Sequence, residues 1–180
     1  MRLFAALVPS AEAIDHLKEA VQPLRDDALR WTSVADWHLT LAFYGELDEA
    51  RLPDLEERLT RAARRHSAVS LALKGAGRFG KHTLWVGCAG ELPAVRRLAQ
   101  SAIAAGRRAG ADVDDKRRFN AHVTLARAYR NRPADLRPYV AALAEYEGPA
   151  WVGREVQLIQ SRLGAGRPRY ETILSAPLAA

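Results

Sequence analysis

An α+β fold (α/β in the broad sense) containing two copies of one strand-and-helix unit is predicted from three observations. Stretches with apolar residues three and four positions apart alternate along the chain with short β-type runs. The segment His38–Phe43 is echoed 84 residues later by His122–Arg127, with four of six residues identical. The length of 180 residues fits one domain, or two small lobes sharing a core, better than two full domains. We therefore expect residues 1–180 to form a single duplicated domain.

Four amphipathic helices are predicted from the spacing of apolar side chains. The first begins after Ser10, which can cap a helix, and the second begins near Asp48. Apolar residues that recur at this spacing form one helix face that packs against the rest of the protein. The positions are Ile14, Leu17, Val21 and Leu24; Leu52, Leu55, Leu59 and Ala62; Leu92, Val95, Leu98 and Ala102; and Leu136, Tyr139 and Leu143.

Seven strands are predicted from runs of β-favouring residues. They lie at residues 1–8, 38–44, 69–75, 83–88, 122–128, 156–163 and 170–175. The glycine-rich, basic stretch at 75–81 is predicted to be the turn of a hairpin between the third and fourth strands. The polar stretch at 112–119 is predicted to be a loop that leads into the fifth strand.

Composition excludes several classes of protein. Hydrophobic residues make up 48% and charged residues 27% of the chain, which excludes whole-chain disorder and coiled coil. No apolar stretch approaches the ~18 residues of a transmembrane helix, so we expect no membrane partner. Cys88 is the only cysteine, which excludes an internal disulfide and a cysteine-based zinc site. A lone thiol suits the reducing cytoplasm, where we expect the protein to be located.

Positive charge is concentrated in one part of the chain. The net charge is +6, yet residues 96–137 alone contain 11 Lys or Arg against 4 Asp, an excess of +7. Such a concentration of arginine and lysine suggests a polyanionic partner. The alternative is that these cations merely form solvated helix faces, and composition does not separate the two.

The repeated segment places chemically useful groups side by side. Because residues i and i+2 of a strand share one face, His38 lies beside Thr40 and His122 beside Thr124. The aliphatic residues between them share the opposite face. If the two strands face each other, two imidazoles and two hydroxyls surround one cleft. One neutral and one protonated histidine suffice for concerted acid–base cleavage of a phosphodiester without a metal.

A metal site is the main competing interpretation of the two histidines. Such a site needs carboxylate or further histidine ligands nearby. Neither strand contains an acid after its histidine, and Asp36 is the nearest acidic residue. We therefore expect no metal and no other cofactor.

The two motifs, His38-Leu39-Thr40-Leu41 and His122-Val123-Thr124-Leu125, resemble the paired H-x-T-x signatures of the 2H phosphoesterase superfamily. More narrowly, the chain is similar to bacterial and archaeal RNA 2′,3′-cyclic phosphodiesterases, also called 2′-5′ RNA ligases. Supporting features that lie outside the motifs are Met1–Leu7, Arg30-Trp31, Arg118-Phe119, Arg127, Ser161-Arg162-Leu163 and Tyr170. The chain departs from the family pattern at Asp36-Trp37, where Asn-Leu is common, and at Ala121, where Pro is common.

The resemblance implies a bilobal fold in which two antiparallel-rich sheets line a central cleft, with helices packed outside. It also implies that His38 is the proton donor to the leaving 3′-oxygen and that His122 is the proton acceptor from the attacking water. Thr40, Thr124 and Arg127 would then bind the phosphate. Arg127 is five residues from His122, so an ideal strand would point it away from the cleft, and a bulge or the long reach of its side chain is required.

The expected reaction is hydrolysis of RNA 2′,3′-cyclic phosphate ends to 2′-phosphates by a monomeric enzyme. The alternatives are reversible 2′-5′ RNA ligation and non-catalytic binding of RNA ends, and the substrate is either an RNA end or a small cyclic nucleotide.

Phe43 is expected in the core. The candidate RNA-binding residues are Phe79, Lys116, Arg117, Arg118, Phe119 and Arg130.

Overall fold

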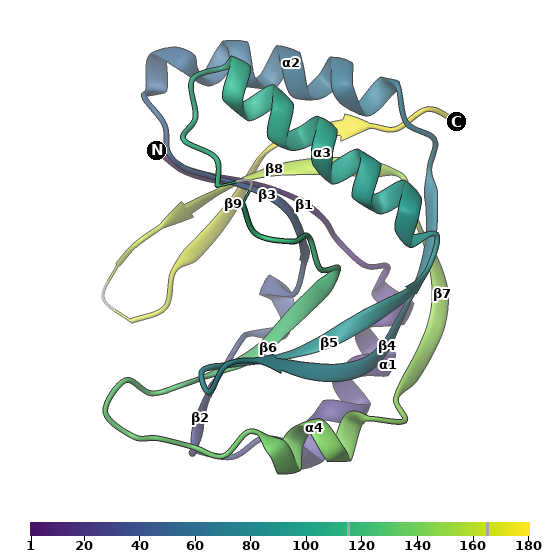
Figure 1. The fold of residues 1–180 in the computed structure, drawn as a ribbon, viewed down its shortest axis with the longest axis vertical. Helices are drawn as coiled ribbons and strands as arrows, with labels where there is room; N and C mark the ends of the chain where they lie inside the picture. Colours follow the sequence, from purple (N-terminus) through teal and green to yellow (C-terminus); the bar gives the residue numbers. More distant parts are fainter. Residues whose placement is uncertain (115, 165) are drawn as a thin grey trace.

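The computed structural model describes residues 1–114, 116–164 and 166–180 (Figure 1). Its helices are α1 (Ala11–Val21), α2 (Leu52–Arg64), α3 (Leu92–Arg108) and α4 (Arg137–Leu143), with 3-10 turns at Gln22–Leu24, Val34–Asp36 and Glu49–Arg51. Its strands are β1 (Arg2–Leu7), β2 (Leu29–Trp31), β3 (Leu39–Glu46), β4 (Val69–Phe79), β5 (Thr83–Gly90), β6 (His122–Ala128), β7 (Glu147–Gly153), β8 (Glu155–Arg162) and β9 (Arg169–Pro177). The predicted α+β class and the four predicted helices are confirmed.

The strands of the described residues form one curled antiparallel sheet. Its order is β7-β4-β5-β6-β3-β1-β8-β9, and β2 pairs with β6 beside this path. The junction between the two halves, β3 with β6, consists of the single residue pair Leu39 and Val123. The two sheets expected from the resemblance are therefore halves of one sheet. Each of these two strands has a bulge just beyond the shared pair, and a bulge bends the strand that carries it.

The helices cover the outer faces of the sheet and leave the inner faces toward each other (Figure 1). Helices α2 and α3 pack on the half that contains β3, β8 and β9, whereas α1 and α4 pack on the half that contains β4, β5 and β7. Helix α1 follows β1 and α3 follows β5, so each of these helices crosses to the other half of the sheet. No described helix is long and apolar enough to cross a membrane.

Capping explains where two of the helices begin. The Ser10 hydroxyl accepts a hydrogen bond from the Ala13 amide at 3.2 Å, and the Asp48 carboxylate accepts one from the Ala50 amide at 3.0 Å. The predicted starts are confirmed, although a 3-10 turn separates Asp48 from α2. Helices α2, α3 and α4 each carry proline in their first turn, where the missing amide donor costs nothing.

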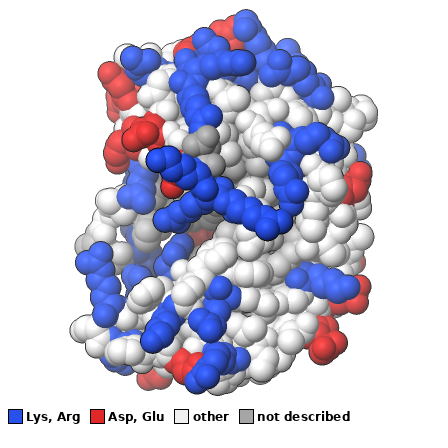
Figure 2. Space-filling model, in the orientation of Figure 1, with Lys and Arg blue, Asp and Glu red and all other residues white. Residues whose placement is uncertain are grey.

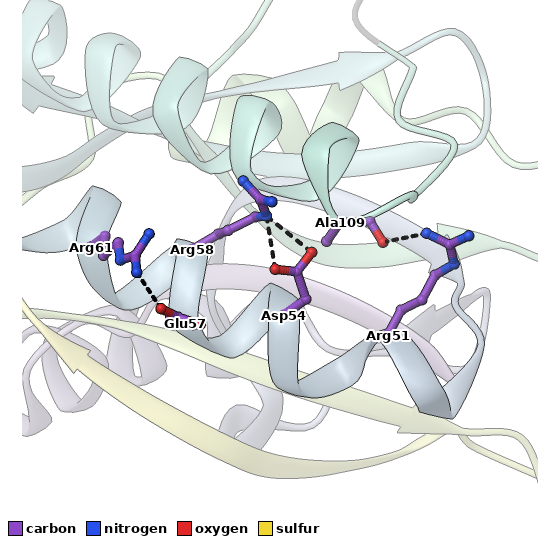
Figure 3. Close-up of polar contacts among 6 residues, drawn as sticks. All are labelled: Arg51, Asp54, Glu57, Arg58, Arg61 and Ala109. Carbon is purple, nitrogen blue, oxygen red and sulfur yellow. Dashed lines mark hydrogen bonds and ion pairs between the residues drawn. The ribbon is translucent and has the colours of Figure 1, made fainter.

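The outer face of α2 carries its own counter-charges (Figure 3). Arg58 forms an ion pair with Asp54 at 3.0 Å, and Arg61 forms one with Glu57. In both pairs the carboxylate lies one helical turn before the arginine. Arg51, just before α2, donates to the Ala109 carbonyl at the end of α3 at 3.4 Å. The positive charges of Arg58 and Arg61 are thus partly neutralised by carboxylates of their own helix.

The predicted glycine-rich turn at 75–81 is wrong in extent, because β4 continues through Phe79 and only residues 80–82 turn. Gly75 has a φ of +66° and lies at an irregularity in the pairing of β4. A Cβ on Gly77 would lie 2.3 Å from the Trp85 ring. These glycines therefore serve a bulge and a close ring contact within the strand, which sequence alone does not distinguish from a turn.

Two strands were missing from the prediction. Strand β2 has only three residues and is held by its pairing with β6, so it has no periodicity of its own. Strand β7 contains Gly148 and Pro149, which normally argue against a strand, but it lies at the edge of the sheet. Both strands depend on a partner rather than on local preference.

The packing of α3 against β3 leaves no room for a side chain at Gly106. A Cβ there would lie 2.4 Å from the fully buried Tyr44 ring, whose hydroxyl donates to the Ala102 carbonyl at 2.9 Å. Gly106→Ala is expected to lower the free energy of unfolding by ~1 kcal/mol, because overpacking at ~1–3 kcal/mol outweighs the gain of ~0.5–1 kcal/mol in helix propensity. Denaturant unfolding measures this. Gln100→Ala, at an exposed position of α3, is the control, and stabilisation by Gly106→Ala would contradict the close packing.

Candidate active site

The two H-x-T motifs meet at the junction of the sheet. Leu39 and Val123 are paired there and are fully buried on the helix-covered face. Directly opposite residues of an antiparallel pair point to the same face, so the flanking residues of both strands share the other face. His38, Thr40, His122 and Thr124 surround the Leu39–Val123 pair on that face, and all four are half-buried.

Both imidazoles are held by the same local hydrogen bond. His38 Nδ1 lies 2.7 Å from the carbonyl oxygen of Asp36, and His122 Nδ1 lies 2.6 Å from that of Asn120. A carbonyl only accepts, so Nδ1 carries the proton in each ring. Nε2 is therefore the nitrogen left to accept or donate a proton in each histidine. Two copies of one backbone contact thus fix the same tautomer in both imidazoles.

Aromatic rings lie against both imidazoles. The centroid of the His38 ring lies 4.7 Å from that of Phe4 and 5.6 Å from that of Tyr170. The His122 ring lies 4.8 Å from Phe79, in an edge-to-face arrangement at 88°, and 5.8 Å from Trp85. These contacts limit the motion of the imidazoles and remove water from their sides.

The surroundings lower the pKa of both histidines. Burial is the main cause for His38 and for His122, and the nearby positive charge of Arg127 lowers each pKa further. The hydrogen bonds to the Asp36 and Asn120 carbonyls act in the opposite direction. Only His38 also has an acid, Asp36, whose negative charge favours its protonated form. The two imidazoles therefore differ in how easily each holds a proton.

A bulge brings Arg127 to the histidine face. In the pairing of β5 with β6, Trp85 lies opposite Thr124 and Leu84 opposite Ala126, so Leu125 is an extra residue in β6. Leu125 and Ala126 are both buried, and the polar face resumes at Arg127. The bulge required by the predicted role of Arg127 is thus present. Arg127 Nη1 donates to the Thr83 hydroxyl at 3.4 Å.

The same bulge occurs in the other motif. In the pairing of β1 with β3, Ala6 lies opposite Thr40 and Ala5 opposite Ala42, so Leu41 is the extra residue. The next residue on the histidine face is Phe43, which corresponds to Arg127 in the second motif. Phe43 is 64% exposed, so the prediction that it lies in the core is wrong. The similarity of the two motifs therefore extends to backbone geometry, with an aromatic ring in one half and a cation in the other.

Sequence reasoning did not assign a role to Arg30. Strand β2 pairs with β6 so that Arg30 lies directly opposite Arg127, and both side chains are exposed. Two like charges at directly opposite positions destabilise a sheet unless an anion lies between them. The Arg30-Trp31 pair noted in the sequence was the only available signal, because β2 has no periodicity of its own.

The candidate RNA-binding residues fall into two groups. Phe79 contacts the His122 ring and is 41% exposed, whereas Phe119 is half-buried. The exposed Lys116, Arg117 and Arg118 lie on the loop that leads from α3 to His122. Arg130 lies beyond the opposite end of β6, so the fold does not bring it together with the others.

The residues described by the structure do not assemble the ligand set of a metal site. Nowhere among them do three or more His, Cys, Asp or Glu side chains gather closely enough to hold a metal ion. Asp36, the acid nearest to His38, contributes its backbone carbonyl to the histidine.

The fold and the site together define a class of protein. A curled antiparallel sheet with one H-x-T motif on each half, and with both motifs on the same face, is the architecture of a two-histidine phosphoesterase. Residues 8–165 match the family model of the 2′-5′ RNA ligase superfamily. The chain belongs to this family, as its motifs had indicated.

Relatives agree with this membership, and a solved structure shares the fold. The chain is 30% identical over 189 residues to an RNA 2′,3′-cyclic phosphodiesterase of Geobacillus stearothermophilus, an alignment that covers 97% of the chain and 56% of that protein. It is 31% identical over 144 residues to one of Aeropyrum pernix, covering 77% of the chain and 80% of that protein. The chain thus spans little more than half the length of the Geobacillus relative. The crystal structure of E. coli LigT in apo form has the same fold, with a TM-score of 0.80 at 24% identity, over 99% of this chain and 98% of that one.

Proposed function

We propose that the protein hydrolyses 2′,3′-cyclic phosphate ends of RNA to 2′-phosphates. The observation that carries this proposal is the pair of imidazoles with Nδ1 bound to a backbone carbonyl and Nε2 left for proton transfer. The relatives from G. stearothermophilus and A. pernix carry the name RNA 2′,3′-cyclic phosphodiesterase.

The reaction needs one base and one acid. Nε2 of neutral His122 accepts a proton from water, and the water oxygen forms a bond to phosphorus. The bond from phosphorus to the 3′-oxygen breaks, and this oxygen takes the proton from Nε2 of protonated His38. The product is a 2′-phosphate with a free 3′-hydroxyl, and the proton gained by His122 returns to His38 through solvent. The negative charge of Asp36 near His38 supports the choice of His38 as the donor.

The remaining groups of the site suit the charge on phosphorus. The hydroxyls of Thr40 and Thr124 lie on the histidine face and can donate to the non-bridging phosphate oxygens. Arg127 adds a charge-assisted donor, and the adjacent Arg30 adds a second positive charge. Charge that develops on these oxygens in the transition state is then met by fixed donors.

Hydrolysis of uridine 2′,3′-cyclic monophosphate in the presence of EDTA tests the proposal, with the product isomer assigned by phosphorus NMR. We expect uridine 2′-phosphate and a rate that does not depend on added metal. Loss of activity in EDTA that zinc or manganese restores would contradict the metal-independent mechanism. Binding of RNA ends without turnover would instead indicate a non-catalytic RNA-binding protein.

The family also favours a second reaction at the same site. A 5′-hydroxyl of RNA can take the place of water, and attack on the cyclic phosphate then yields a 2′-5′ linkage with the same two proton transfers. Incubation of a cyclic-phosphate RNA with a 5′-hydroxyl RNA, followed by gel analysis, detects this product.

We further propose that the protein acts as a cytoplasmic monomer, which light scattering and cell fractionation would check.

The pH dependence of hydrolysis is expected to be bell-shaped and acidic. A free histidine titrates near ~6.5, and burial lowers the pKa of both His38 and His122. Above both pKa values neither imidazole carries the proton to be donated, and below both no base is left, so kcat/KM falls on either side. The maximum of kcat/KM should lie below pH ~6.5. The pKa values that the two limbs report belong to the coupled pair and not to either histidine alone.

Bound phosphate favours the imidazolium form, so the profile of kcat should lie at higher pH than that of kcat/KM. Steady-state rates across the acidic and mildly alkaline range measure both profiles. A rate that rises steadily into the alkaline range would indicate hydroxide or metal-bound water as the nucleophile.

A further inference from the structure

We propose that a basic groove between α3 and the loop before β6 binds the RNA strand on the 5′ side of the cyclic phosphate. This inference rests on the proposed function and extends it from the reacting end to the rest of the strand. A 2′,3′-cyclic phosphate can only be the 3′ end of an RNA, so all remaining nucleotides leave the site on one side. The groove consists of two adjoining cavities.

The first cavity adjoins His122. It has a volume of about 320 Å³ and is lined by Lys74, Gly75, Ala76, Trp85, Gly87, Cys88, Leu92, Arg96, Phe119, Asn120 and Ala121. Gly87, one of these lining residues, lies directly opposite His122 in the pairing of β5 with β6. Trp85, which contacts the His122 ring, forms a wall of this cavity. A nucleotide bound here would thus be next to the reacting phosphate.

The second cavity continues from the first along α3. It has a volume of about 440 Å³, and Arg96 and Phe119 line both cavities. Its other lining residues are Ala99, Gln100, Ile103, Ala104, Arg107, Arg117 and Arg118. The shared residues make the two cavities one groove that begins at His122 and follows the exposed face of α3. Both volumes are within the range of ~300–1000 Å³ that ligand sites occupy.

The groove combines the two features that single-stranded RNA requires. Cations follow the phosphates, and aromatic rings stack on the bases. Arg96, Arg117 and Arg118 supply the cations, and the rings of Phe119 and Trp85 line the first cavity. Figure 2 shows the basic side chains as a nearly continuous band across the middle of this face, with acidic side chains mainly at its rim.

The groove cations differ from two of the α2 arginines in their pairing with carboxylates. The α2 arginines Arg58 and Arg61 are paired with carboxylates of their own helix (Figure 3). Within the residues that the structure describes, neither Arg96 nor Arg118 forms an ion pair, and Arg117 has only the exposed Asp114 at 3.7 Å. Arg132, beyond the other end of β6, is also differently placed, since it donates to the Asp27 carbonyl and stacks on Tyr129.

The test compares two triple variants that remove equal charge. The first is Arg96→Gln with Arg117→Gln and Arg118→Gln, which removes three positive charges from the groove. The matched control is Arg97→Gln with Arg64→Gln and Arg65→Gln. Arg97 is the exposed neighbour of Arg96 on α3, but it lines neither cavity. Its charge instead lowers the pKa of His66, which lies between α2 and β4 in the chain.

The measured quantity is the ratio of kcat/KM for a decauridylate with a 2′,3′-cyclic phosphate end to that for uridine 2′,3′-cyclic monophosphate. We expect the groove variant to lower this ratio about tenfold or more and the control to leave it nearly unchanged. Each lost phosphate contact should also reduce the slope of log affinity against log salt by ~0.7 for a single strand. Equal effects of the two triples, or an equal fall for both substrates, would overturn the groove.

A binding measurement separates this inference from the proposed reaction. Fluorescence anisotropy of the same labelled RNA with the double variant His38→Ala/His122→Ala reports binding without turnover. If RNA binds and depends on Arg96 but no cyclic phosphate is hydrolysed, the groove stands and the proposed reaction fails. If the mononucleotide is hydrolysed but the RNA has no advantage, the reaction stands and the groove fails. Displacement of the RNA by polyglutamate at equal charge would show a general polyanion surface and would also overturn the assignment.

Discussion

His38→Ala and His122→Ala are each expected to lower kcat for cyclic-phosphate hydrolysis by ~10²-fold or more, because general acid or base catalysis contributes ~10²–10⁴. Both imidazoles are fixed through Nδ1 by a backbone carbonyl, at 2.7 and 2.6 Å, so each offers Nε2 to the reacting atoms. Alanine removes the proton-transfer group and leaves the hydroxyls and arginines in place. Steady-state kinetics with uridine 2′,3′-cyclic monophosphate measures the loss.

The double variant distinguishes a concerted pair from two independent groups. If the two histidines act in one step, the double variant should be little slower than either single variant, since residues that act as a unit are not additive. Near wild-type single variants combined with a very slow double variant would contradict the concerted pair. Circular dichroism and thermal unfolding of each variant check that the fold is retained. His16→Ala, on α1, is the control for loss of a histidine elsewhere.

Arg127→Ala is expected to lower kcat by ~10²–10³, the usual effect of removing one donor that stabilises transition-state charge. The bulge at Leu125 turns Arg127 to the face of His122, and its charge lowers the pKa of both histidines. Arg127→Lys should restore part of the rate because it keeps the charge but loses the planar fork of donors. Arg130→Ala, beyond the end of β6, is the matched control.

The pH profile supplies a second readout for Arg127. Removal of its positive charge should raise the pKa of both His38 and His122, so the maximum of kcat/KM should move to higher pH. A variant that only loosened the sheet would lose activity without this shift. An Arg127→Ala enzyme with full activity and an unchanged profile would show that the arginine is a surface residue bound to Thr83.

Much of the site follows from the sequence because it depends on local pattern. The two H-x-T motifs carry their own parity, which alone places His38 beside Thr40 and His122 beside Thr124. The helices follow from apolar spacing and from capping residues such as Ser10. These features are set by residues only a few positions apart.

Other features depend on pairing between distant segments, and the sequence did not determine them. Arg127 and Phe43 reach the polar face only through bulges at Leu125 and Leu41, which exist because neighbouring strands impose their register. Gly77 looked like part of a turn but lies under the Trp85 ring within a strand. Arg30 acquired a place beside Arg127 only when β2 paired with β6.

The division has one physical reason. Periodicity records which face of a strand or helix a residue occupies, and that information is complete within one element. Which elements become neighbours depends on long-range hydrogen bonding and packing, such as the pairing of Leu39 with Val123 and the crossing of α3 to the other half of the sheet. The sequence by itself determined that each motif carries a histidine and a threonine on one face, whereas only the tertiary structure decided how Arg127 reaches that face and which residues line the neighbouring cavities.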